Sequence, residues 1–338
     1  MKKIFVCLML LLLLLPLALR LAEPGTSGQF AAAPGEPGFL DQALGQPPAL
    51  IRAWGRLNSL LGDSGSPQVV MGREGFLFFR PALDSVLGQG LMSDPEVEAL
   101  AQALHTLHQA LQAQGTAFAL LVAPDKGQVV PQYLPPHIRP VNQENSNLSR
   151  LLTRLSELGV PAPDVRNLLQ QQAQPAYLPR DSHWTAWGAY VALQEGLFAL
   201  CIPGLKEYSP DDFSKVVPAP GDLVPLYLPG LADTQTDRVP EMSRAYRASR
   251  PIRSLDDLKI STTGPQGGPR LLVARDSFGR ALFPFLANLA GTLEFSRDYA
   301  GLADRAREQD GVLVVIAQRD LPVLLDRLGL DEQPAGAE

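Results

Sequence analysis

The residue types that could carry chemistry are concentrated at positions 181–188, where the sequence reads DSHWTAWG. This stretch holds one of the chain's four His and two of its three Trp. Asp181 and His183 are two residues apart, so in an extended segment their side chains would point to the same side. A carboxylate in that position can orient an imidazole and make it a general base for a nucleophile elsewhere in the chain.

Ser277 is the candidate nucleophile. It follows an apolar run at 270–274, which predicts a strand, and it precedes a predicted helix at 279–289. In an open parallel sheet, functional groups gather at the carboxyl ends of the strands, and the N–H groups of a helix start can stabilise an oxyanion. His183 would remove the proton of Ser277, and Asp181 would hold the tautomer of His183. We therefore expect His183 to lie within hydrogen-bond reach of Ser277.

Each of these residues also has a purely structural interpretation. A Ser that follows a strand is often the N-cap of the next helix. His183 could be a core histidine with a satisfied hydrogen bond, and an Asp-x-His pair before a helix could be a capping arrangement. The occurrence of both motifs in one chain favours catalysis.

The elements that must position these residues alternate along the chain. Residues 69–79 predict an apolar hairpin, and the Pro-rich residues 208–250 predict an irregular excursion over the surface. Apolar strands separated by amphipathic helices indicate an α/β fold with a parallel sheet that helices cover on both faces. The predicted strands are 117–123, 160–165, 270–274, 292–295 and 311–317, and the predicted helices are 95–114 with Asp94 as N-cap, 145–158, 185–199, 279–289 and 321–328.

Composition excludes some classes of function. The net charge of −6 and the pI near 5.3 argue against nucleic acid as a partner, because phosphate binding needs a basic surface. Two cysteines, Cys7 and Cys201, are too few for a disulfide framework or a thiolate metal site. We predict no metal and no cofactor, and we expect Cys201 to be a buried thiol.

The amino terminus predicts export. Lys2 and Lys3 precede an apolar run at 4–19, which is typical of a secretory signal. A poor cleavage site after the run favours an uncleaved anchor with its basic end inside, and a cleaved signal is the alternative. The expected organisation is a signal anchor at 1–22, a flexible linker at 23–48, the folded domain at 49–330 and a disordered tail at 331–338.

Together, the two motifs resemble those of the alginate O-acetyltransferase family of the AlgX/AlgJ type. The family's Asp-x-His-Trp-Thr-x-x-Gly matches 181–188, and its strand followed by Asp-Ser-Phe matches 270–278. Weaker matches are the hairpin at 69–79, the segment from Pro124 to Pro135 and the Gly-Asp-Leu at 221–223. The resemblance spans roughly 69–328 and implies an SGNH-hydrolase-like fold.

The resemblance also implies a function. Ser277 would be the nucleophile, His183 the general base and Asp181 its orienter, in a transfer of acetyl groups to an exopolysaccharide through an acetyl-serine. It implies a periplasmic protein on the inner membrane and a membrane-bound O-acyltransferase that supplies the acetyl groups. An acetyl esterase with the same triad and a non-catalytic polysaccharide-binding scaffold are the alternatives.

Four further residues are candidates for substrate binding. Trp184 could stack on a sugar, with core packing as the alternative, and Thr185 follows it in the motif. Arg275 stands where the family often has Gly, and it could screen the oxyanion, contact an acidic polymer or face solvent. Lys126 could line the cleft or lie with Asp125 in a solvated loop.

Overall fold

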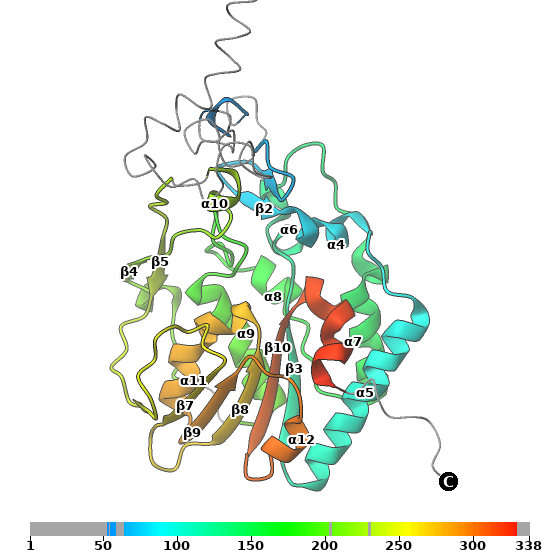
Figure 1. Cartoon of the computed structure of the whole chain (residues 1–338), viewed down its shortest axis with the longest axis vertical. Helices are drawn as coiled ribbons and strands as arrows, with labels where there is room; N and C mark the ends of the chain where they lie inside the picture. The colour runs from blue at the N-terminus through cyan, green and yellow to red at the C-terminus, as the bar shows by residue number, and fades with distance from the viewer. Residues whose placement is uncertain (1–52, 54, 59–63, 203–204, 229–230, 330–338) are drawn as a thin grey trace, which may run out of the picture.

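The computed structural model describes residues 53, 55–58, 64–202, 205–228 and 231–329, and a six-stranded sheet lies at its centre (Figure 1). Four neighbouring strands are parallel, whereas β7 runs antiparallel to β9 and β6 antiparallel to β7. The α/β class is confirmed, but the sheet is mixed at one edge rather than wholly parallel. The strand order is β3 (Ala117–Ala123), β10 (Gly311–Ala317), β8 (Arg270–Arg275), β9 (Thr292–Ser296), β7 (Lys259–Thr263) and β6 (Arg247–Ala248).

Both faces of the sheet are apolar and covered. In β10 every residue is buried, and alternate side chains enter two separate hydrophobic clusters, Leu313 and Val315 in one and Val312 and Val314 in the other. This is the pattern that a parallel strand covered on both faces requires. Figure 1 shows the helices α9 and α11 on one side of the sheet and α5 and α7 on the other. The first layer contains α8 (Arg166–Gln170), α9 (Ala186–Ala199) and α11 (Phe283–Leu289), and the second contains α5 (Asp94–Ala113), α7 (Asn147–Glu157), α12 (Leu302–Arg305) and α13 (Leu324–Leu328).

Two local predictions are wrong for identifiable reasons. Residues 160–165 form no strand, because Pro161 and Pro163 have no N–H to donate to a ladder. A backbone hydrogen bond from the Leu120 N–H to the Pro161 carbonyl, at 2.9 Å, still links this segment to β3. The N-cap of α5 is Ser93 rather than Asp94, and it forms a capping box with Glu96.

The Pro-rich region contains more structure than the sequence indicates. The strands β4 (Lys215–Pro218) and β5 (Thr236–Val239) form a hairpin, and α10 (Val224–Tyr227) lies between them. The expected hairpin near the start of the domain is confirmed as β1 (Val69–Met71) and β2 (Leu77–Phe79). Two further short helices are α4 (Asp84–Leu87) and α6 (Lys126–Val129).

The predicted anchor, linker and tail lie outside the described residues. Within the described ranges, no helix is both long and apolar enough to cross a bilayer. Cys201 is exposed and has a φ of 53°, which corrects the prediction of a buried thiol.

Candidate active site

Two segments meet at the carboxyl end of the sheet and join Ser277, His183 and Asp181 in one hydrogen-bonded chain. The Oγ of Ser277 lies 2.8 Å from Nε2 of His183, and Nδ1 of His183 lies 2.6 Å from Oδ1 of Asp181. Strand β8 ends at Arg275, Asp276 follows it, and Ser277 is the first residue of the 3₁₀ helix η5 (Ser277–Leu282). The expected contact between His183 and Ser277, which are 94 residues apart, is therefore present.

The segment that holds Asp181 and His183 is a tight bend, not the extended stretch that the spacing suggested. Oδ1 of Asp181 accepts a hydrogen bond from the backbone N–H of His183 at 2.8 Å as well as contacting its ring. This local turn places the carboxylate and the imidazole together without a strand. The bend is followed by an isolated antiparallel bridge between Tyr177 and Trp184.

A second carboxylate, that of Asp222, also reaches this bend. Asp222 accepts from the backbone N–H of Ser182 at 2.7 Å and from its hydroxyl at 2.6 Å, and Oδ2 lies 3.4 Å from Nδ1 of His183. The N–H of Asp222 donates to Oδ2 of Asp181 at 3.1 Å. The sequence offered only one signal for this role, the weak Gly-Asp-Leu match at 221–223.

Gly221 permits this approach of the two chain segments. A Cβ at that position would lie 1.9 Å from the carbonyl oxygen of Arg180, a contact that no side chain can make. Only glycine therefore allows Asp222 to lie beside Asp181.

The two carboxylates govern the charge of the imidazole. Burial opposes a positive charge on His183, but hydrogen bonds to Asp181 and Asp222 outweigh it and raise the pKa of His183 above its usual value. Burial likewise opposes ionisation of Asp222, but hydrogen bonds from His183 and Ser182 lower its pKa to about 2. The carboxylates of Asp181 and Asp222 thus stabilise the protonated imidazole of His183.

On the other side of the site, Asp276 holds the position of Ser277. Its carboxylate accepts from the N–H of Phe278 at 2.8 Å and from the N–H of Ala317 at 2.6 Å, which ties the ends of β8 and β10 together. Asp276 is therefore the N-cap of η5, so the interpretation of Ser277 as a helix cap is wrong. Among the described residues, the N–H of Ser277 has no hydrogen-bond partner and is free to bind an oxyanion.

Lys126 is buried, which corrects both expectations for it. Its Nζ donates to the carbonyls of Leu77 (2.7 Å), Leu178 (2.6 Å), Pro179 (2.8 Å) and Asp181 (2.9 Å). Burial lowers its pKa to about 7, against the charges of Asp181 and Asp222. The four carbonyls favour the ammonium form, because a neutral amine has only two N–H groups to donate.

Lys126 therefore clamps the start of β2 to the segment that leads into Asp181. Its neighbour Asp125 is also buried and accepts from the hydroxyl of Ser85 at 2.6 Å, and burial raises the pKa of Asp125 to about 7. Neither residue lies in a solvated loop.

Arg275 is likewise a structural residue rather than an oxyanion or polymer contact. Its side chain is fully buried, and its guanidinium donates to the carbonyls of Leu255, Asp257 and Asp276. Burial lowers its pKa to about 10. The side-chain stem fits because a Cβ at Gly279 would lie 2.6 Å from the Arg275 Cβ, so glycine leaves the needed space.

Trp184 packs in the core and also borders the cleft beside the triad, whereas Thr185 caps a helix. Trp184 is 2% exposed, its Nε1 donates to the carbonyl of Phe278 at 3.0 Å, and its ring meets the Phe278 ring edge-on. Thr185 is the N-cap of α9, where its hydroxyl accepts from the N–H of Gly188 at 3.0 Å. Core packing and capping are therefore the roles that the structure gives these two residues.

A cleft of about 590 Å³ opens beside the triad. The triad residues and Asp222 line one part of it, and apolar side chains line much of the rest. The apolar part comes from the β4–β5 hairpin, from the residues that follow β5 and from the start of α11, and includes Pro218, Val239, Pro240, Met242 and Pro284. The cleft therefore depends on a hairpin within residues 208–250, for which the sequence predicts an irregular path.

The protein is similar in sequence to a probable alginate O-acetylase AlgJ of Pseudomonas syringae pv. tomato, with 29% identity over 174 residues. That match covers 49% of this chain and 43% of the relative. A second probable alginate O-acetylase AlgJ, from Pseudomonas putida, is 27% identical over 169 residues, which cover 48% of this chain and 43% of the relative. The matched part thus spans less than half the length of these relatives.

Solved structures share the fold. PatB1 of Bacillus cereus superposes with a TM-score of 0.56 at 19% identity, covering 75% of this chain and 96% of PatB1. A DHHW family protein from Eubacterium siraeum superposes with a TM-score of 0.55 at 16% identity, covering 78% and 99% of the two chains. A model of the family described as "SGNH hydrolase-like domain, acetyltransferase AlgX" matches residues 69–296, so the chain belongs to the AlgX family of SGNH hydrolase-like acetyltransferase domains.

Proposed function

We propose that this protein is an O-acetyltransferase that moves acetyl groups to an alginate-like exopolysaccharide through an acetyl-serine at Ser277. The 2.8 Å contact between Ser277 and His183 carries the proposal, because it puts a base on the nucleophile, and Asp181 orients that base. Membership of an acetyltransferase family supports the choice of acyl group. The names of the AlgJ relatives support alginate as the type of acceptor.

The first half-reaction loads the serine. His183 takes the proton of the Ser277 hydroxyl at Nε2 while Oγ attacks the carbonyl carbon of an acetyl donor. The free N–H of Ser277 is available to the oxyanion, and the carboxylates of Asp181 and Asp222 stabilise the imidazolium. His183 then gives its proton to the leaving group, and the acetyl group remains on Oγ.

The second half-reaction unloads it. A sugar hydroxyl attacks the acetyl carbon and loses its proton to His183, and the same proton returns to Oγ as the acetylated sugar leaves. Water in place of the sugar would give acetate, which is the esterase reaction of the same site. Binding of a polysaccharide without catalysis does not require a serine, an imidazole and a carboxylate in one hydrogen-bonded chain.

The proposal extends to location and partners. The basic start and apolar run at 4–19 would anchor the protein in the inner membrane with its domain in the periplasm. A membrane-bound O-acyltransferase would supply the acetyl groups from across that membrane. A cleaved signal would leave the domain free in the periplasm.

The test separates transfer from hydrolysis. The purified protein is given an activated acetyl ester with mannuronate oligosaccharides, and mass spectrometry follows acetylated sugar and the mass of the peptide that contains Ser277. We expect a gain of one acetyl group on that peptide and on the sugar. Acetate alone, across several acceptors, would favour the esterase, and glycan binding without either product would favour the scaffold.

A further inference from the structure

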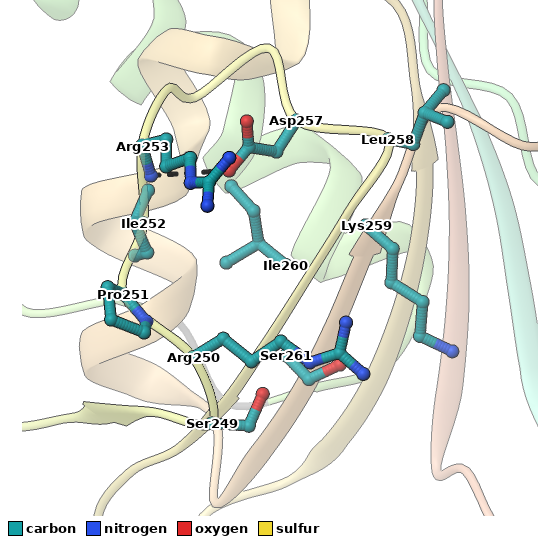
Figure 2. A pocket seen from close by; sticks show the side chains of 10 residues that line it. All are labelled: Ser249, Arg250, Pro251, Ile252, Arg253, Asp257, Leu258, Lys259, Ile260 and Ser261. Carbon is teal, nitrogen blue, oxygen red and sulfur yellow. Dashed lines mark hydrogen bonds between the residues drawn. The ribbon is translucent and has the colours of Figure 1, made fainter.

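A second hollow, of about 800 Å³, lies beside the segment that joins β6 to β7. Residues 249–253 and 257–261 line it, and Figure 2 shows the Ile260 side chain pointing into the space that this segment encloses. Three basic side chains, Arg250, Arg253 and Lys259, are among its walls, with Asp257 as the one carboxylate in the lining. This hollow, called the β6–β7 pocket below, contains none of the triad residues.

The charge of this region departs from that of the chain. Residues 238–259 contain six basic and three acidic residues, a net charge of +3, in a chain whose net charge is −6. Lys259 forms an ion pair with Glu294 at 2.6 Å. Within the described part of the chain, the guanidinium groups of Arg250 and Arg253 have neither an ion-pair nor a hydrogen-bond partner. Unpaired guanidinium groups at the mouth of a hollow favour a carboxylate ligand, which they can bind through two hydrogen bonds.

The remaining walls fit a sugar ring. Pro251 and Ile252 provide apolar surface, and Leu258, which lies across the hollow from them in Figure 2, is 77% exposed. The hydroxyls of Ser249 and Ser261 lie in the same lining. A pyranose that carries a carboxylate has an apolar face, hydroxyl groups and one negative charge, which correspond to these three kinds of wall. A simple inorganic anion would make no favourable contact with the apolar walls.

The same segment separates this pocket from the triad cleft. Leu255 lines the cleft, and the Asp256 carboxylate lies 3.2 Å from the guanidinium of Arg280, which lines the cleft too. Arg253 and Asp257, on either side of them in the chain, line the β6–β7 pocket. A chain of linked sugars that leaves the cleft over this segment would therefore meet the pocket.

We propose that the β6–β7 pocket is a subsite for an acidic sugar residue, which holds an anionic polysaccharide next to the catalytic cleft. The cleft combines the carboxylates of Asp181, Asp222 and Asp237 with the basic side chains of Lys215 and Arg280, whereas the β6–β7 pocket has three basic side chains and one carboxylate, so the pocket adds the positive charge that an anionic chain requires. That the polysaccharide is the acetyl acceptor rests on the proposed function. The binding of an acidic sugar at this pocket does not.

The experiment measures binding without catalysis. In the full chain carrying Ser277→Ala, calorimetry compares a uronate oligosaccharide with a neutral oligosaccharide of equal length at constant ionic strength. We expect the uronate to bind more tightly, and the added pair Arg250→Gln and Arg253→Gln to weaken it by about tenfold. The pair Arg139→Gln and Arg307→Gln removes the same charge from exposed sites elsewhere and should change the affinity by less than about twofold.

The charge-preserving pair Arg250→Lys and Arg253→Lys provides a further check on folding, and it should lose less affinity than the glutamine pair. Equal affinity in the glutamine pair and its control, equal binding of neutral and acidic sugars, or no binding of the uronate would each overturn the subsite. None of these outcomes depends on acetyl transfer, so the proposed function is tested separately.

Discussion

The two sides of the catalytic site are built in different ways. Ser277 lies where β8 passes into η5, and the Asp276 side chain and the ladder between β8 and β10 set its position. His183 lies in a bend between the loop after α8 and helix α9, with no strand of the central sheet to support it. Hydrogen bonds from Lys126 to backbone carbonyls and from the bend to Asp181 and Asp222 hold that segment instead.

The two sides differ in how many hydrogen bonds hold each catalytic residue in place. A strand end is held by many equivalent backbone bonds, so one substitution leaves most of them in place. A bend held by a few side chains depends on each of them. We therefore expect distant substitutions to reduce catalysis on the histidine side and mainly to reduce stability on the serine side.

Removal of the Ser277 Oγ, through which the serine side contacts His183, should have the largest effect on activity. Ser277→Ala deletes the nucleophile, and we expect kcat on an activated acetyl ester to fall on the order of 10⁴-fold or more. Ser156→Ala, at an exposed position of α7, is the matched control and should match the unchanged protein. Turnover of the Ser277→Ala protein at the full rate would remove the triad assignment.

The next test breaks the clamp of the histidine side. Lys126→Met removes four hydrogen bonds to carbonyls and frees the segment that ends at Asp181, and misplacement of catalytic groups by about 1 Å can cost about 10²-fold. We expect kcat to fall by about that factor while KM for a small ester changes little. Circular dichroism would verify folding, and Lys206→Met, at an exposed site, is the control. An unchanged kcat in a folded Lys126→Met protein would contradict the clamp.

Asp222→Asn tests the second carboxylate through pH. His183 must be neutral to act as a base, so activity rises as pH rises through its pKa, which lies above the usual value. Asp222 contributes to that rise in pKa, so loss of its charge should move the acidic limb of the pH profile to lower pH and reduce kcat by about tenfold. Asp211→Asn, which is exposed, should leave the limb in place. A limb that does not move would show that Asp222 has no effect on His183.

The smallest effect on activity is expected from the serine side. Arg275→Met leaves the carbonyls of Leu255, Asp257 and Asp276 without their donor and should lower the free energy of unfolding by about 2–4 kcal/mol. Because the strand ladder still holds Ser277, kcat should fall by less than about tenfold. Denaturant unfolding and ester kinetics measure the two quantities, with Arg307→Met as the surface control. A loss of kcat larger than that of Lys126→Met would reverse the comparison.

The sequence by itself determined the local parts of this protein. The unbroken apolar runs at 117–123 and 311–317 predicted two strands of the main sheet with their observed bounds, since a strand buried on both faces must be apolar throughout. The strand before Ser277 and the helix after Thr185 follow from equally local patterns. The candidate triad came from two short motifs, because nucleophile, base and orienter need particular residue types at particular places.

Only the tertiary structure decided how these parts meet. Lys126 and Arg275 look like solvent-facing cations in the sequence, but backbone carbonyls from distant segments surround both. Asp222 and the β4–β5 hairpin belong to the site because chain segments far apart in the sequence approach one another in the fold. The sheet has an antiparallel edge because the chain enters β7 in the direction opposite to β9. Hydrophobic periodicity reports which face of an element is buried. It carries no information on which carbonyl, carboxylate or imidazole a remote loop brings to that face.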